Sequence, residues 1–408
     1  MFAIALGGLS VPGAADTQAS RPGNVSAALT RLERDNAWTI RQQVAVCEIP
    51  APPFKEAARA ASVRRRYEQV GLRNVRIDSI GNVIGERRGV GKGPTVMLAG
   101  HLDTVFPEGT DVRVKRAGTR FSGPGISDDC RGLAVVLAVA RAMELAKVRT
   151  AGTVIFVANV GEEGPGNLRG VRHLFRDGAP RPDFFISVDG AGTRITSRAV
   201  GSQRYRVTFA GPGGHSYDAF GMPNPIHALG RAISAISDIR VPSTPKTTFN
   251  VGLVSGGTSV NSIAASASMD VDLRSESPAA LDSVTRLFRA AVDGALAAEN
   301  ARWPASSVRL TVRVDDVGLR PAGGQDDSAP IVSAAIAAGR TLGFVPATTA
   351  SSTDANIPMS LGLPAITIDG GGAGDGSHSL GEWYDDGTSG FLGPQWVLLI
   401  VMALAADG

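Results

Sequence analysis

The stretch TVMLAG, residues 95–100, is a short apolar run that ends in glycine. GLAVVLAVARAMEL at 132–145 and TVIFVANV at 153–160 follow it. The first and third runs are too short for helices and apolar at successive positions, which is typical of strands buried on both faces of a parallel sheet. The middle run predicts a buried helix. Further short runs at 183–188 and 365–368 predict more buried strands, so the order of elements indicates an α/β domain.

Between residues 200 and 317 the pattern changes to alternation of polar and apolar residues. Alternating runs at 204–210, 247–254, 265–273 and 307–314 are separated by helical patterns at 225–236 and 278–296. This is the split β-α-β-β-α-β order, and alternation indicates strands with one solvated face. We predict a small ferredoxin-like α+β domain at 200–317, inserted into a larger domain made of 24–199 and 318–408. Helices are expected at 329–342 and 396–406.

The chain has 408 residues, more than the about 250–300 at which a single core stops growing. Its 41 Lys and Arg against 38 Asp and Glu give a net charge of +3, which does not favour nucleic acid or an anionic membrane as partner. No apolar run is long enough for a membrane span. Only Cys47 and Cys130 are present, which excludes a disulfide framework; we expect two buried thiols, with one bridge as the alternative.

Residues 1–23 allow two interpretations. The apolar stretch 2–11, followed by several alanines, is like the end of a secretory signal, but no Lys or Arg precedes it. The segment is either a signal remnant on a periplasmic or secreted protein, or a loose tail on a cytoplasmic one.

Polar clusters fall at or just after the carboxyl ends of the apolar runs, where open α/β sheets bind ligands. Each cluster alone is weak evidence, because acidic pairs are common in turns and helix caps. Their recurrence at strand ends predicts one shared site. The clusters are His101 with Asp103, Asp128 with Asp129, Glu162 with Glu163, Asp189, and His378.

Histidines with carboxylates and no thiolate suit Zn²⁺, and also Mn²⁺ or Co²⁺. Two cations about 3.5–4 Å apart need a bridging carboxylate. If each cation is also bound by one histidine and one carboxylate of its own, the site requires two histidines and three acids. Glu162 is then left over as a general base on water, and Asp103 could accept the second imidazole N–H of His101. The ligand set is His101, Asp128, Glu163, Asp189 and His378.

With these motifs the chain resembles the M20 family of co-catalytic zinc peptidases, which includes carboxypeptidase G2-like, aminoacylase-like and peptidase T-like enzymes. The resemblance covers about residues 30–405. It implies a mixed sheet flanked by helices, with an inserted lid that commonly forms the dimer. The matching stretches are GHLDTVFP (100–107), GPGISDDCRG (123–132), EEGPGNLRG (162–170), SVDG (187–190), GPGGHS (211–216), GGTSVNSI (256–263), DLRS (272–275) and the tail at 351–385.

The resemblance also implies roles. His101 and Asp189 would bind one zinc, Glu163 and His378 the other, and Asp128 would bridge them, often with a cis peptide after it. Asp103 would support His101, and Glu162 would be the base.

In the lid, His215 would steady the oxyanion, while Asn261 and Arg274 would contact the carbonyl and the carboxylate of the substrate. His215 and Asn261 would act on the partner subunit's site. Gly371 and its glycine neighbours are expected to let substrate approach backbone N–H groups. The alternatives are a turn residue at His215, a loop cap at Asn261, a surface charge at Arg274 and a flexible turn at Gly371.

Three features remain beside these roles. Cys130 stands where many members have Lys, and Ala264 replaces a common Pro. Asp354 and Asn356 are expected next to the site.

These observations predict a metal-dependent exopeptidase that cleaves short peptides near a free terminus and forms a homodimer through the lid. Peptidase T-like aminopeptidase activity is favoured. The alternatives are a carboxypeptidase, an aminoacylase acting on N-acyl amino acids, a hydrolase of non-peptide amides, and a silent binding protein.

Overall fold

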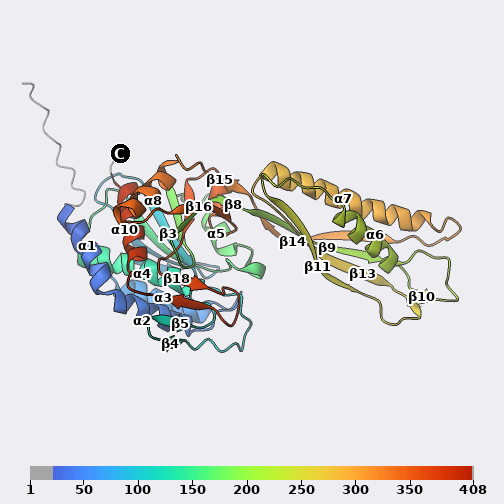
Figure 1. Cartoon of the computed structure of the whole chain (residues 1–408), viewed down its shortest axis with the longest axis horizontal. Coiled ribbons are helices and arrows are strands. Elements are labelled where there is room, and N and C mark those ends of the chain that lie inside the picture. Colours follow the sequence, from blue (N-terminus) through green and yellow to red (C-terminus); the bar gives the residue numbers. More distant parts are fainter. Residues whose placement is uncertain (1–21, 407–408) are drawn as a thin grey trace, which may run out of the picture.

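The computed structural model describes residues 22–406 of the chain. The segment interpreted as a signal remnant or tail, 1–23, lies outside this range except for residues 22 and 23, which begin helix α1 (Pro22–Arg34). Figure 1 shows a larger α/β body and an elongated extension that carries helices α6 and α7. We call the extension, residues 201–320, the lid, and the remainder the main body.

A nine-stranded mixed sheet forms the centre of the main body. Strand β3 (Val96–His101) pairs in parallel with β6 (Val154–Asn159) and β7 (Phe184–Val188), and β7 pairs in parallel with β17 (Ala365–Ile368). These are the four strands predicted from the apolar runs, and their parallel pairing is confirmed. Antiparallel pairs make the sheet mixed. The remaining strands are β1 (Arg73–Ile77), β2 (Val83–Arg87), β8 (Arg194–Ala199), β15 (Gly323–Gly324) and β16 (Ala347–Ser351).

Helices cover both faces of this sheet, which explains the continuous apolar runs. Val96 and Leu98 of β3 pack into the core with helix α4 (Cys130–Leu145), while Met97 and Ala99 face the opposite core. Successive side chains of a strand point to opposite faces, so both parities must be apolar. The first face also carries α1, α2 (Asn36–Cys47), α3 (Ala57–Gln69), α8 (Pro330–Thr341) and α10 (Leu392–Leu404); the second carries α5 (Arg169–Leu174) and α9 (Asn356–Ser360).

The lid has the predicted β-α-β-β-α-β order. Its four-stranded sheet runs β11-β13-β9-β14, and α6 and α7 pack on one face of it. The opposite face is polar, as the alternation predicted. The elements are β9 (Gly201–Ala210), α6 (Pro225–Ser237), β11 (Thr247–Gly256), β13 (Ser266–Ser275), α7 (Pro278–Ala301) and β14 (Thr311–Arg320), with a small pair β10 (Gly214–His215) and β12 (Ser262–Ile263).

The last lid strand differs from its prediction. Alternation suggested residues 307–314, whereas β14 spans Thr311–Arg320. An irregularity in the register between Asp316 and Gly318 breaks the alternation, and the strand then continues until Arg320 pairs with Ser202. The two chain crossings between the lid and the main body therefore lie side by side.

Two further expectations concern the described residues. Cys47 and Cys130 are both buried and unbridged. Among residues 22–406, the helices are either too short or too polar to cross a membrane.

Candidate active site

Residues from well-separated segments meet at one edge of the central sheet. His101 is the last residue of β3, and Asp189 and the Glu162–Glu163 pair follow β7 and β6 closely. Because these strands are parallel, their carboxyl ends share an edge. Asp128 lies just before α4 at the same edge. The polar clusters predicted from the sequence therefore converge.

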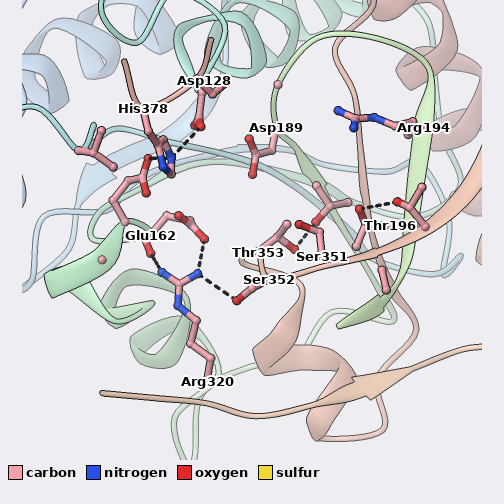
Figure 2. Close-up of a pocket in the computed structure, with 18 of the residues that line it drawn as sticks. Asp128, Glu162, Asp189, Arg194, Thr196, Arg320, Ser351, Ser352, Thr353 and His378 are labelled. Carbon is pink, nitrogen blue, oxygen red and sulfur yellow. Dashed lines mark hydrogen bonds and ion pairs between the residues drawn. The ribbon is translucent and has the colours of Figure 1, made fainter. Parts of the chain in front are cut away.

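His378 reaches this edge from a different sheet. It lies in the loop between β18 (Ala373–Asp375) and β19 (Trp383–Asp385), which pair with each other, and β19 also pairs with β5 (Arg120–Ser122). This small sheet is completed by β4 (Lys115–Ala117). The hairpin projects the imidazole toward Asp128 (Figure 2), and the imidazole also pairs with Glu163.

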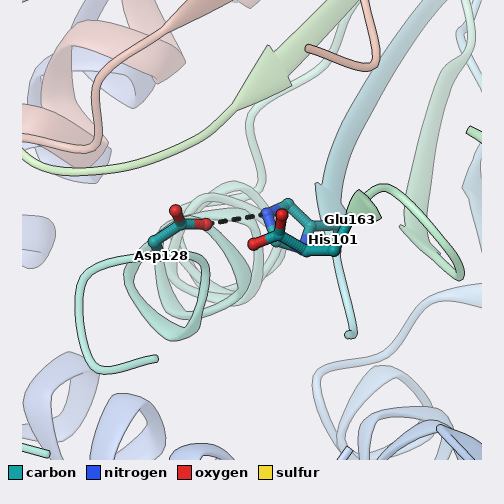
Figure 3. A group of neighbouring side chains, drawn as sticks. All are labelled: His101, Asp128 and Glu163. Atoms are coloured by element: carbon teal, nitrogen blue, oxygen red, sulfur yellow. Dashed lines mark hydrogen bonds and ion pairs between the residues drawn. The ribbon is translucent and has the colours of Figure 1, made fainter. Parts of the chain in front are cut away.

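The two oxygens of Asp128 face two different imidazoles. Oδ1 lies 3.0 Å from Nε2 of His101, and Oδ2 lies 3.2 Å from Nε2 of His378. Asp189 Oδ1 is 4.0 Å from the His101 nitrogen, and Glu163 Oε1 is 3.1 Å from the His378 nitrogen. Figure 3 shows His101, Asp128 and Glu163, whose donor atoms all lie within 4.8 Å of one another. The Asp128 carboxylate thus lies between the two imidazoles.

The charges of the cluster are arranged for a cation. Burial, together with the charge of Asp128, raises the pKa of Asp189 to about 8. Hydrogen bonds to Asp128 and Glu163 raise the pKa of His378 to about 10. Crowded carboxylates of this kind repel one another, and a divalent cation relieves the repulsion. Imidazole nitrogens and carboxylate oxygens without thiolates are the donor set that Zn²⁺, Mn²⁺ and Co²⁺ accept, so the residues fit such ions.

Asp103 holds the site together in a different way from the prediction. The Nδ1 atom of His101 bonds the backbone oxygen of Asp103 at 3.0 Å, whereas the Asp103 carboxylate is 3.7 Å away. That carboxylate instead accepts hydrogen bonds from the backbone N–H groups of Glu162 at 3.0 Å and Glu163 at 2.9 Å. The expectation that the side chain fixes the imidazole tautomer is therefore corrected: the backbone oxygen does so.

Asp129 positions His101 and the start of α4. Its Oδ2 accepts the backbone N–H of His101 and its Oδ1 that of Gly132, both at 2.9 Å. The peptide bond between Asp128 and Asp129 is cis, as the resemblance implied.

The comparison with known families decides which family this is. The family model described as peptidase family M20/M25/M40 matches residues 97–390, well over half of the chain. The chain belongs to this family. The resemblance drawn from the motifs is thereby confirmed, and this M20 member is a metal-dependent hydrolase.

Related sequences cover unequal parts of the chain. Carboxypeptidase G2 of Pseudomonas sp. (strain RS-16) is 28% identical over 297 residues, which cover 70% of this chain and 68% of that protein. Two Pyrococcus relatives match over only 38% and 44% of their own lengths. The substrates of these relatives therefore do not establish the substrate of this chain.

Solved structures share the fold. Aminopeptidase PepT from Bacillus cereus ATCC 10987 has a TM-score of 0.74 at 19% identity, covering 92% of this chain and 99% of that one. The YXEP protein of Bacillus subtilis, a dinuclear metal binding peptidase of the M20 family, has a TM-score of 0.67 at 18% identity, covering 93% and 99%. These likenesses confirm the mixed α/β architecture with its inserted lid.

Sequence patterns did not point to Arg320, the last residue of β14 in this M20 chain. Its Nη1 lies 3.0 Å from Oε1 of Glu162, and its Nη2 donates to the Glu162 backbone oxygen (Figure 2). Burial raises the pKa of Glu162 well above its ordinary value, and the Arg320 charge opposes that rise. A single Arg at the end of an irregular strand forms no recognisable sequence pattern, so only the three-dimensional fold reveals the contact.

Glu382 was also missed. It is fully buried, and its carboxylate accepts the backbone N–H groups of Gly125 and Ser127 at 2.8 Å and of Asp128 at 2.9 Å. Glu382 thereby ties the loop of His378 to the loop of Asp128. Its spacing four residues after His378 was the available signal.

A cavity of about 720 Å³ opens beside the cluster, between the main body and the lid. Acids and His378 line one end, and the remainder carries cations and hydroxyl groups. Arg194, which was not predicted, is held by Asp369 through its Nε at 3.0 Å. The cations are Arg194, Arg204, Arg274 and Arg320, and the hydroxyl residues include Thr196, Thr349, Ser351, Ser352 and Thr353.

Arg274 is therefore placed at the cavity, whereas the other two lid residues are not. His215 lines a separate hollow of about 600 Å³ on the lid, and its imidazole is half exposed beside Asp218. Asn261 is exposed near it, and the Asn261 backbone oxygen accepts the Ser216 N–H at 2.9 Å. Within one chain, these two residues do not join the cluster.

The expectation for Gly371 is corrected. Gly371 is buried, and a Cβ at this position would meet Cα of Gly393 at 2.6 Å and the backbone oxygen of Gly390 at 3.1 Å. It is not among the residues that line the cavity. Its φ of +81° and its close packing against α10 explain why the residue is glycine. The two expected reasons, the approach of substrate and a flexible turn, do not apply.

Asp354 and Asn356 are buried and closely follow Thr353, which lines the cavity. The carboxylate of Asp354 is buried and accepts a hydrogen bond from Nδ2 of Asn159 at 2.7 Å. Asn356 donates its Nδ2 to the backbone oxygens of Val200 and Pro321, both at 2.9 Å. Val200 and Pro321 flank the lid, so Asn356 holds together the two segments through which the chain enters and leaves the lid.

Proposed function

We propose that this M20 hydrolase cleaves a peptide bond near a free terminus of short peptides, with two divalent cations and with Glu162 as general base. The observation that carries the proposal is the placement of Asp128. Its two oxygens face His101 on one side and His378 on the other, which is the arrangement a bridging carboxylate needs.

The expected ligand sets agree with the distances. His101 and Asp189 would hold one cation, Glu163 and His378 the other, and Asp128 would be shared. When bound, the cations would polarise the scissile carbonyl and lower the pKa of water. Zinc is the metal we favour for this donor set, with Mn²⁺ or Co²⁺ as alternatives.

The proton is handled by Glu162. Asp103 fixes the backbone of this residue and Arg320 fixes its carboxylate, so the group that takes a proton from the attacking water is already in place. The same carboxyl can then deliver the proton to the leaving amine. Burial raises its pKa, which makes it a better acceptor than an exposed glutamate.

The cavity supports a short substrate. About 720 Å³ is enough for a small peptide or an N-acyl amino acid, and Arg274 can hold a carboxylate. The fold neighbour PepT is an aminopeptidase, while the relative from Pseudomonas is a carboxypeptidase. Because Arg274 would serve a terminal carboxylate in either case, carboxypeptidase or aminoacylase action is the second candidate.

We also propose a homodimer formed through the lid. Strand β11 is an edge strand, and Leu253 and Val254 on it are exposed, as are Tyr217 and Val260 nearby in the lid. Exposed apolar edges of this kind mark sites of association. A dimer would let His215 reach the cavity of the other subunit, where its imidazole could donate to the oxyanion.

A panel of free, N-blocked and C-blocked dipeptides and tripeptides tests this proposal. The protein is stripped with a chelator and then supplied with Zn²⁺, Mn²⁺ or Co²⁺. Hydrolysis that needs a free amine indicates aminopeptidase action, and hydrolysis that needs a free carboxylate indicates carboxypeptidase or acylase action. Unchanged hydrolysis after stripping would contradict the metal proposal.

A further inference from the structure

We infer that the cavity selects substrates in which the residue held by Arg274 carries a second carboxylate, as glutamate and aspartate do. The inference rests on the proposed function, in which Arg274 receives one carboxylate. It comes from a surplus of positive charge on the lid wall beside Arg274.

The surplus begins in a ladder of ion pairs on the polar face of the lid sheet. Away from the cavity, Arg206 forms a two-point pair with Asp270, with distances of 2.7 Å and 2.6 Å. One step closer, Asp272 receives Nε of Arg204 at 3.2 Å and Nε of Arg274 at 2.6 Å. Two guanidinium groups therefore share one carboxylate at the end of the ladder.

Only this end of the ladder reaches the cavity. Arg204 and Arg274 line it, whereas Arg206 and Asp270 do not. Because Asp272 balances one of the two guanidinium groups, a single carboxylate of a substrate would complete the balance there. That carboxylate is the one assigned to Arg274.

A second hollow of about 410 Å³ adjoins the cavity and shares Arg274, Ser351 and Ser352 with it. Lys246 and Arg198 supply its other cations. We call this hollow the cationic groove. Lys246 is exposed to solvent, so its charge is accessible to a ligand.

The cationic groove holds an unmatched cation of its own. Arg198 is 3.6 Å from Glu276, but the ammonium of Lys246 has no ion-pair partner within residues 22–406. Arg198 of the main body and Glu276 of the lid offset each other. Among the other groups of the lid wall, Arg204, Arg274 and Lys246 give three positive charges and Asp272 gives one negative charge, a surplus of two. One carboxylate leaves one positive charge unmatched.

The placement of Lys246 suits a side-chain carboxylate. Thr248 pairs with Arg274 across β11 and β13, and Lys246 precedes Thr248 by two residues, about 7 Å along an extended chain. The flexible side chain of Lys246 can span that separation. It can thereby reach the second carboxylate of the substrate residue whose first carboxylate binds Arg274. The hydroxyls of Thr248 and Ser351, which also line the groove, can donate to it.

The test compares substrates that differ only in this second charge. For the metal-loaded protein, kcat/KM is measured on alanyl-glutamate and alanyl-glutamine, and on N-acetylglutamate and N-acetylglutamine. We expect the glutamate member of whichever pair is cleaved to be preferred about tenfold or more, as one charge-assisted contact provides. Lys246→Met should bring the ratio close to one.

Arg206→Met is the matched control, because Arg206 lies on the same face of the lid sheet but is fully paired and outside the groove. It should keep the preference. If the wild-type protein cleaves both members of a pair equally, the inference is overturned while the proposed function stands.

Calorimetric binding of N-acetylglutamate and N-acetylglutamine tests the groove even if no amide is cleaved. Tighter binding of N-acetylglutamate that is lost in Lys246→Met supports the groove, whereas equal binding of the two overturns it. Absence of all hydrolysis with every metal would instead count against the proposed function.

Discussion

Arg320 of the lid and Glu162 of the main body face each other, with Nη1 of the arginine 3.0 Å from Oε1 of the glutamate. Each side chain is only 7% exposed, so the pair is shielded from solvent and couples the position of the lid strand to the proposed base. Arg320→Met should lower kcat by about a hundredfold, because a fixed partner of a buried catalytic charge is lost. Steady-state kinetics measure this effect.

The matched control is Arg313→Met on the same strand. Arg313 pairs with Asp315 at 2.9 Å, but its side chain is 75% exposed, and such pairs contribute little. Equal losses of kcat in the two variants would mean that Arg320 acts only through the stability of the lid.

Glu162→Gln should reduce kcat by about a thousandfold or more, because an amide cannot accept the proton. The side chain keeps its size and its contact with Arg320. Metal content, measured by mass spectrometry of the purified variant, should remain that of the wild type. A variant with wild-type kcat would remove Glu162 from the role of base.

Gly371→Ala should destabilise the protein by about 2 kcal/mol or more, because its new Cβ overlaps Cα of Gly393 and its φ is +81°. The change is measured by urea unfolding. Gly387→Ala is the control, since Gly387 also has a positive φ, of +52°, but no atom lies within 4 Å of the place that its new methyl group would take. A similar loss in both variants would show that backbone conformation alone requires the glycine at Gly371.

The ladder of the lid makes a prediction about pH. The hydrogen bond from Arg206 holds the pKa of Asp270 below its ordinary value. A carboxyl whose pKa is lower in the folded state stabilises the fold above its unfolded pKa of about 4, and this contribution is lost as the pH falls through the folded value. Asp270→Asn should therefore cost about 0.5 kcal/mol at pH 7 and nothing in strong acid. Urea unfolding at several pH values measures the difference, and a cost that persists in acid would contradict the ion pair.

Local sequence patterns were sufficient to predict the buried strands and the buried helix of the main body. Buried parallel strands such as β3 and β6 must be apolar at every position, and α4 must be rich in small apolar residues, so both were predictable. The candidate ligands were predictable because they follow those strands. The extension of β14 was not, because the irregularity at Asp316 breaks its alternation.

Contacts between distant segments were harder to predict. Arg320 lies 158 residues from Glu162, and Glu382 lies 254 residues from Asp128. A buried acid and an exposed one look alike in a sequence, so the position of Glu382 four residues after His378 did not identify its partner, and Arg320 had no signal at all. Asp103 was correctly placed but assigned the wrong partner, since the path of the Glu162–Glu163 loop decides which donors its carboxylate meets.

The most direct test of the account is anomalous diffraction from crystals of the protein loaded with zinc. Two peaks are predicted on opposite sides of the Asp128 carboxylate, one beside His101 and Asp189 and the other beside Glu163 and His378. The absence of both peaks, or a single peak that leaves one histidine without an ion, would contradict the proposed pair of cations.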